Sequence, residues 1–167
     1  MKTLLFLCGP NGIGKTTISR KIVEMRPHTA HVDSDPCRLM NPFELNDETI
    51  PTIAKNISDM IGNYLDCPVV DTVIFTYGFH GRRREVFERV LQNLSGREYR
   101  FLPFLLCCEE EENIKRMAGD GRDQARIARA VAQSRKAFDG VPYPTIDVTH
   151  LDAKQAAQTI MHNAEII

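Results

Sequence analysis

Short strand-like segments alternate along the chain with segments in which apolar residues recur every three or four positions. The strand-like segments lie at residues 3–8, 29–33, 69–76, 99–108 and 145–148. Residues 3–8 form an apolar run without polar alternation, which indicates a strand covered on both faces, as in a parallel sheet. Pro103 interrupts the fourth segment, so we expect either a bulge there or a strand that starts only at Phe104.

The periodic segments predict helices between these strands. They lie at residues 15–26, 46–65, 83–94, 124–138 and 152–164, and a further helix opens at the acidic residues 109–112. Residues 117–123 break the pattern and are expected to form a loop. The alternation predicts an α/β fold, a three-layer sandwich in which a five-stranded parallel sheet carries helices on both faces.

Size and charge narrow the classes of function. The chain has 167 residues and a formal net charge of −1, which favours a single domain over residues 1–167 and gives no basis for binding nucleic acid. No apolar stretch approaches the ~20 residues that span a bilayer. The five cysteines include no C-x-x-C pair, so we expect reduced thiols in a cytoplasmic protein, with a metal site as the alternative.

The main candidate for chemistry is residues 9–16, Gly-Pro-Asn-Gly-Ile-Gly-Lys-Thr, which fit G-x-x-x-x-G-K-[ST] at every fixed position. A predicted strand precedes the motif and a predicted helix follows it, so a chance glycine-rich turn is disfavoured. Backbone N–H groups of such a loop cradle phosphates, the lysine reaches the β- and γ-phosphates, and the hydroxyl ligates Mg²⁺. The predicted nucleotide-binding residues are Gly9, Asn11, Gly12, Ile13, Gly14, Lys15, Thr16 and Thr17.

With this motif, the order and length of the elements resemble the small P-loop kinases of the adenylate kinase-like group. The shikimate kinase and gluconate kinase branch, with its uncharacterised relatives, is the most similar. The resemblance implies a P-loop NTPase fold of the nucleoside monophosphate kinase type, with ATP and Mg²⁺ as cofactors and a small-molecule acceptor. It also implies an acceptor-binding region at about residues 34–64 and a mobile LID at about 117–127.

The second strand ends in Asp33-Ser34-Asp35, and shikimate kinase-like proteins carry an Asp-x-Asp at this place. The resemblance assigns Asp33 to the magnesium side, as a metal ligand and possible general base, and Asp35 to the acceptor, together with Arg38. Residues i and i+2 of an extended segment project to the same side, which suits one cleft. The alternative is an exposed helix cap before Pro36.

The third strand exits into Tyr77, Gly78, Phe79 and His80, of which the first three are assigned to the acceptor pocket and His80 is a further candidate lining residue. The arginines at 82–84 suit an anionic acceptor, although a solvated helix start is the alternative. Many P-loop proteins end this strand in an acidic residue. This chain has Thr76 there, so Asp33 would have to supply the carboxylate beside magnesium.

Arginines bracket the glycines at 119 and 121, as in the LID of the same kinases. Arg122 and Arg126 are the predicted catalytic arginines, which would stabilise charge on the transferred phosphoryl group. Arg116 is assigned to the nucleotide and Arg135 to the acceptor, whereas Arg129 is expected on the surface. Residues 149–152 are candidates for packing against the adenine. As an alternative, arginines on an amphipathic helix are usually solvated.

These observations predict an ATP-dependent phosphotransferase that moves the γ-phosphoryl group to a hydroxyl or phosphate of a small molecule. The acceptor would lie between residues 33–64 and 76–84. Two alternatives remain open: a nucleotide, nucleoside, antibiotic or polynucleotide kinase, and a non-catalytic regulatory module. A GTPase is disfavoured because no Asn-Lys-x-Asp stretch occurs. The sequence is compatible with a monomer or a homodimer.

Overall fold

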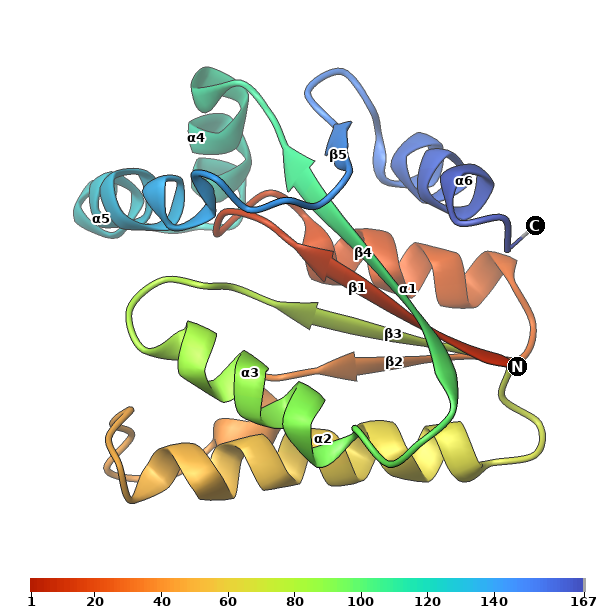
Figure 1. Ribbon diagram of the computed structural model, residues 1–167. Coiled ribbons are helices and arrows are strands. Elements are labelled where there is room, and N and C mark those ends of the chain that lie inside the picture. The colour runs from red at the N-terminus through yellow and green to blue at the C-terminus, as the bar shows by residue number, and fades with distance from the viewer. Residues whose placement is uncertain (167) are drawn as a thin grey trace.

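The first apolar run forms the central strand of a parallel sheet (Figure 1). The computed structural model describes residues 1–166, and within them the sheet has five strands in the order β2-β3-β1-β4-β5. They are β1 (Lys2–Cys8), β2 (Thr29–Asp33), β3 (Thr72–Tyr77), β4 (Tyr99–Cys107) and β5 (Thr145–Asp147). All neighbouring strands are parallel, which confirms the predicted fold class.

Helices cover both faces of the sheet (Figure 1). One face carries α1 (Lys15–Met25) and α6 (Ala153–Asn163), and the other carries α2 (Thr49–Asp66) and α3 (Arg83–Asn93). The remaining helices, α4 (Glu110–Gly119) and α5 (Gln124–Ser134), follow β4, and short 3₁₀ helices occupy Pro36–Arg38 and Lys136–Phe138. None of the helices within residues 1–166 is both long enough and apolar enough to cross a membrane.

The core has two layers because successive side chains of β1 point to opposite faces of the sheet. Leu5 and Leu7 pack with α1 and α6, whereas Leu4 and Phe6 pack with α2 and α3. The ring of Phe6 is fully buried, and its centroid lies 4.5 Å from that of Phe87. β1 is therefore fixed from both sides, and this fixes the direction in which its carboxyl end leaves the sheet.

The proline in β4 causes neither of the expected irregularities. The register of β4 with β1 is continuous from Tyr99 to Leu105, so the strand neither bulges at Pro103 nor starts at Phe104. The Leu105 amide donates to the Pro144 carbonyl, on the β5 side of the strand. The backbone nitrogen of Pro103, two positions earlier, faces the same side. Because β5 pairs only with Leu105–Cys107, no partner at Pro103 requires an N–H donor.

Two other predicted boundaries were wrong. β3 begins at Thr72 rather than residue 69, because residues before it form a turn in which the Val70 amide donates to the Cys67 carbonyl. The expected loop at 117–123 shrinks to residues 120–123, because α4 continues to Gly119 with Met117 fully buried against the glycine-rich loop. The predicted helix at 124–138 ends at Ser134.

Truncating the central aromatic side chain tests this packing. We expect Phe6→Ala to lower the free energy of unfolding by about 3–5 kcal/mol, because it removes a fully buried ring between β1 and α3. Val69→Ala is the control, since Val69 is 64% exposed and should change stability by less than about 0.5 kcal/mol. Urea denaturation of both variants measures the difference. Similar losses in the two variants would contradict the packing described here.

Candidate functional site

The glycine-rich loop lies where β1 ends. Neighbouring atoms stand so close to Gly9 and Gly12 that a side chain would not fit at either position. Gly9 has φ +148°, and a Cβ there would stand 2.6 Å from the Leu106 carbonyl oxygen. Gly12 has φ +78°, and a Cβ there would stand 2.1 Å from Met117 Cγ. Backbone angles of this kind strain any side-chain-bearing residue. The loop is thus wedged between β4 and α4, and its path is set by backbone contact.

Polar contacts hold the loop from outside. The Asn11 amide donates to Ser134 Oγ at 3.3 Å, and Asn113 Nδ2 donates to the Asn11 carbonyl at 3.0 Å. Within residues 1–166, no hydrogen bond is made by the backbone amides of Gly12, Gly14, Lys15 and Thr16. Free amides at a helix N-terminus are a binding site for an anion, because they add hydrogen bonds to the positive end of the helix dipole.

Lys15 lies beside these amides. Its ammonium donates to the carbonyls of Gly9 at 2.7 Å and Pro10 at 2.9 Å. Burial, together with the charges of Arg122 and Arg83, lowers the pKa of Lys15 to about 8. Such a lowered pKa means that the surroundings disfavour the cation. A phosphate placed at the free amides would supply the missing negative charge.

Two oxygen ligands converge next to the lysine. Thr16 Oγ1 donates to Asp33 Oδ2 at 3.2 Å, and the other carboxylate oxygen of Asp33 accepts the Asp35 amide at 3.0 Å. Thr16 and Asp33 fit Mg²⁺, which prefers oxygen and usually takes only one or two protein ligands beside phosphate and water. Within residues 1–166 no group of three His, Cys, Asp or Glu side chains is arranged to hold a metal ion, so the remaining ligands would come from phosphate and water.

Thr76, which lies beside Asp33 on the neighbouring strand β3, supports the assignment of Asp33 to the magnesium side. Thr76, where many P-loop proteins have an acidic residue, holds its hydroxyl 3.1 Å from His31 Nε2. Asp33 pairs with Thr76 in the register of β2 and β3. At the carboxyl ends of these two paired strands, Asp33 therefore supplies the carboxylate that position 76 lacks.

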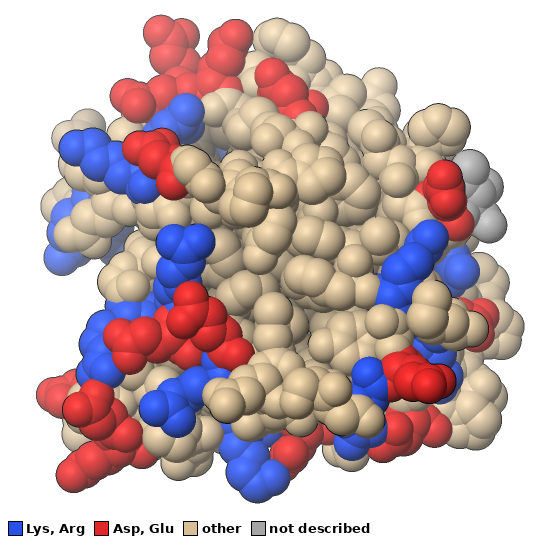
Figure 2. All heavy atoms as spheres, viewed as in Figure 1, with Lys and Arg blue, Asp and Glu red and all other residues tan. Residues whose placement is uncertain are grey.

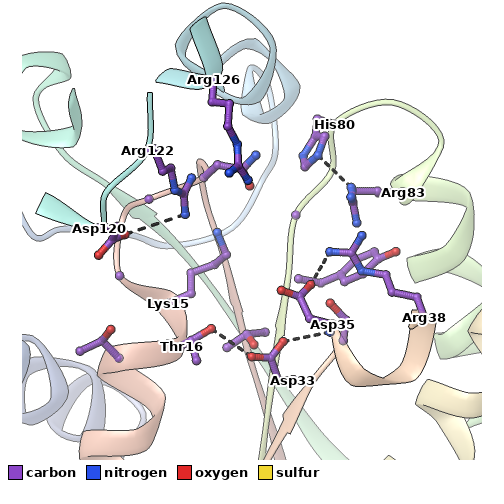
Figure 3. Close-up of a pocket in the computed structure, with 18 residues that line it drawn as sticks. Lys15, Thr16, Asp33, Asp35, Arg38, His80, Arg83, Asp120, Arg122 and Arg126 are labelled. Carbon is purple, nitrogen blue, oxygen red and sulfur yellow. Dashed lines mark hydrogen bonds and ion pairs between the residues drawn. The ribbon is translucent and has the colours of Figure 1, made fainter. Parts of the chain in front are cut away.

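These residues open onto a cleft of about 310 Å³ at the carboxyl ends of β1, β2 and β3. Arg122 reaches in from the loop between α4 and α5, and Arg126 from the first turn of α5. His80, in the loop after β3, and Arg83, the first residue of α3, face them, with Lys15 below (Figure 3). The space-filling view, which looks across the strands, shows basic and acidic side chains mainly toward the edges of the molecule and uncharged residues over much of the centre (Figure 2). Ligand sites of open α/β sheets occupy this edge.

A second cavity, of about 400 Å³, lies on the other side of the glycine-rich loop. Ile13, Thr17, Arg116 and residues 151–153 contribute to its lining. Arg116 donates to the carbonyls of Ile13 at 3.2 Å and Val148 at 2.7 Å, and forms an ion pair with Glu112 at 2.9 Å. Its guanidinium is therefore engaged in joining the glycine-rich loop to the segment after β5. This cavity is where the sequence predicted the adenine.

Comparisons with known proteins identify chains that are similar in sequence or in fold. No protein-family model matches the chain. A guanylate kinase from Trichormus variabilis is 26% identical over 177 residues, covering 94% of this chain and 86% of that protein. The tunicamycin resistance protein of Deinococcus radiodurans has a TM-score of 0.73 at 18% identity, covering 100% of this chain and 98% of its own.

A shikimate kinase from Acinetobacter baumannii has a TM-score of 0.60 at 18% identity, covering 99% of this chain and 94% of its own. A gluconokinase from Sinorhizobium meliloti has a TM-score of 0.62 at 14% identity, covering 98% and 94%. The chain has the P-loop kinase fold. It shares this fold with the shikimate kinase and the gluconokinase, and a five-stranded parallel sheet with helices on both faces is what the sequence predicted.

In this P-loop kinase fold, most of the predicted site residues gather at the main cleft. They are Asn11, Gly12, Gly14, Lys15, Thr16, Thr17, Asp33, Asp35, Arg38, Tyr77, Gly78, Arg122 and Arg126. Gly9 instead supports the loop from beneath, where it packs on Leu106, and Ile13 lines the second cavity. The P-loop kinase fold thus brings residues from three strand ends to one place.

Two predicted acceptor residues do not line the cleft. Phe79 is buried in the core, with its ring 5.0 Å from that of Phe87 and 5.4 Å from that of Phe138. Arg135 donates to the Cys108 carbonyl at 3.1 Å and faces Glu110, which directs it toward α4. The sequence did not separate these positions from their neighbours, because the direction of each side chain depends on tertiary packing.

Other cleft residues were not assigned individually from the sequence. Arg83 and Asp120 line the main cleft, and Arg129, which was expected on the surface, lines an adjoining hollow of about 300 Å³ with Arg122 and Arg126. The run at 82–84 was the signal for Arg83. Nothing in the sequence distinguished Arg83 from Arg82, whose side chain forms ion pairs with Asp47 and Glu85 outside the cleft.

The lowered pKa of Lys15 predicts a pH effect on stability. Between pH 8 and 10.5 the unfolded chain carries the proton on Lys15 and the folded chain loses it, so folding stability gains from rising pH across this window. Lys15→Met removes this gain. We expect the free energy of unfolding of the variant, minus that of the parent, to fall as the pH rises from 8 to 10. Urea denaturation at several pH values measures it.

The matched control is Lys55→Met, since the Lys55 side chain is 69% exposed on α2. Its difference from the parent should stay constant over the same pH range. If the Lys15→Met difference were equally constant, the ammonium would not be held in a disfavoured charged state.

Proposed function

We propose that the chain is an ATP-dependent phosphotransferase that moves the γ-phosphoryl group to a hydroxyl or phosphate of a small molecule. The observation that carries the proposal is a partly buried ammonium, Lys15, beside four free backbone amides, with arginines across the cleft. Positive groups that converge on one point suit a transferred phosphoryl group, whose oxygens carry the charge of the transition state. The similarity to a guanylate kinase supports the same reaction class.

In this proposal the triphosphate lies on the free amides and the adenine in the cavity next to Arg116. Thr16 and Asp33 hold Mg²⁺, which when bound neutralises charge on the phosphates. Both oxygens of Asp33 are already engaged, one by Thr16 and one by the Asp35 amide. This favours Asp33 as the magnesium-side residue and leaves Asp35 to hold the acceptor hydroxyl.

Arg122 and Arg126 would act as the LID arginines. Arg122 lies in the loop at residues 120–123, which is the irregular part of the predicted LID at 117–127, and Arg126 lies in the helix turn that follows it. Their guanidinium groups face Lys15 from the opposite wall (Figure 3). Closure of this loop over the phosphates would exclude water, and this separates phosphoryl transfer from ATP hydrolysis.

The remaining assignments go with this function. The chain would form one P-loop kinase domain, with its acceptor region at about 34–64, act in the cytoplasm as a monomer or homodimer, and have no nucleic-acid partner. A nucleotide kinase is the second candidate, and the guanylate kinase relative favours it. A regulatory module with no acceptor is less well supported, because it gives no role to Arg38, His80 and Arg83 on the wall facing the phosphate site.

Two variants test the proposal by ADP release over a panel of sugars, sugar acids, nucleosides and nucleotides with Mg–ATP. Lys15→Ala should abolish turnover with every acceptor. Asp33→Asn should lower kcat by about 10²–10³-fold, because it weakens a charge that acts on the transition state, with a smaller effect on the Kd of Mg–ATP. Asp59→Asn, on the exposed face of α2, is the control and should behave like the parent.

Calorimetry with Mg–ATP and Mg–GTP on the folded parent protein decides the first step. If the folded protein bound neither Mg–ATP nor Mg–GTP, the proposed function would be wrong. Normal turnover by Lys15→Ala would do the same.

A further inference from the structure

Three buried polar atoms without a hydrogen-bond partner line one wall of the cleft. They are Arg38 Nε, Tyr77 Oη and His80 Nδ1, and they make up half of the six such side-chain atoms within residues 1–166. An unpartnered buried polar group costs free energy, so proteins seldom keep several together. Their gathering on one wall indicates that a ligand supplies the missing partners.

At least two of the three atoms are hydrogen-bond donors. Arg83 Nε, which always carries a proton, donates to His80 Nε2 at 2.8 Å. The pKa of His80 is lowered to about 4 by burial and by the charges of Arg83 and Lys15, so its ring is neutral near pH 7. A neutral ring that accepts at Nε2 carries its proton on Nδ1. His80 Nδ1 and Arg38 Nε are therefore both donors in search of an acceptor.

The same wall has an excess of positive charge. The guanidinium groups of Arg38 and Arg83 lie next to each other (Figure 3), and burial together with the charge of Arg38 lowers the pKa of Arg83. Arg38 forms an ion pair with Asp35, whose side chain is 72% exposed at the rim, and this leaves Arg38 Nε free. Within residues 1–166 Arg83 forms no ion pair with a carboxylate, whereas its neighbour Arg82 pairs with both Asp47 and Glu85.

We propose that this wall is a binding site for an anionic group of the acceptor, a carboxylate or a phosphate, held by Arg38, Arg83 and His80. Such a group accepts several hydrogen bonds and supplies the negative charge that Arg83 lacks. The planar guanidinium fork matches both chemistries. The inference rests on the proposed function, because it names the class of acceptor that the phosphotransferase uses: small acids or phosphate esters with a free hydroxyl or phosphate.

The layout of the cleft agrees with two separate anion sites. Lys15, Arg122 and Arg126 surround the proposed phosphate site, and Arg38, His80 and Arg83 stand on the other side, with Asp33 and Asp35 below them (Figure 3). At Gly78 an added Cβ would stand 3.4 Å from His80 Nδ1, so the glycine keeps the approach to that donor open. The acceptor would be held by its anionic group on one wall, with its reacting oxygen toward the phosphate site.

Binding of simple anions tests the site without knowledge of the acceptor. The protein is first saturated with Mg²⁺ and a non-hydrolysable ATP analogue, so that the glycine-rich loop is occupied. It is then titrated with propionate, ethyl phosphate or neutral propionamide, and thermal stability is followed. We expect a saturable rise in Tm with propionate or ethyl phosphate and none with propionamide. The stronger of the two anions distinguishes a carboxylate acceptor from a phosphate acceptor.

Variants then locate the anion. Arg83→Gln and Arg38→Gln should each weaken anion binding by about tenfold or more, since each removes a charged hydrogen-bond donor. Arg82→Gln is the matched control, because its side chain pairs outside the cleft, and it should bind like the parent. Using two separate variants guards against misfolding of either one.

Three outcomes would overturn the inference: no stabilisation by either anion, equal binding by Arg83→Gln, Arg38→Gln and the parent, or a preferred acceptor that is neutral and keeps its KM in Arg83→Gln. In each case the nucleotide analogue would still bind, and the proposed phosphotransferase function would stand. If the analogue itself failed to bind, the proposed function would fail instead.

Discussion

The site depends on one ammonium that the fold holds where a cation is disfavoured. Lys15 donates to two carbonyls of its own loop, and burial together with neighbouring arginines lowers its pKa to about 8. Within residues 1–166 it forms no ion pair with a carboxylate, and four free amides lie beside it. An anion that binds beside Lys15 therefore stabilises the folded protein. Without an anion, packing elsewhere offsets the unfavourable free energy of this charge.

That packing comes from both faces of β1. Phe6 and Leu7 are fully buried in opposite layers of the core, so the strand cannot shift without loss of contacts on one side. Gly9 and Gly12 then press against β4 and α4 at distances that admit no side chain. The loop is thus rigid before a ligand arrives, and this preorganisation is what electrostatic stabilisation of a transition state requires.

The sequence predicted those parts of the site whose geometry is local. Lys15, Thr16 and Asp33 line one cleft as expected, because a strand end and a helix start determine where such side chains point. Pro103 was misjudged because its tolerance depends on how far β5 extends along β4, which only the sheet topology decides. Phe79 and Arg135 were misassigned for a similar reason, since neighbouring residues of one segment point to the core or the cleft according to tertiary contacts.

Arg82 and Arg83 show why charge alone could not identify the wall of the cleft that carries Arg38, His80 and Arg83. Arg82 caps the start of α3 and Arg83 is its first residue. Arg82 forms ion pairs with two carboxylates at the surface, whereas Arg83 turns inward and donates to His80. That contact fixes the proton of His80 on Nδ1, where it faces the cleft without a partner. A neutral histidine is thereby made a fixed donor beside two arginines. The chemistry of the wall follows from this one inward-facing side chain, because it sets both the charge and the direction of the donors.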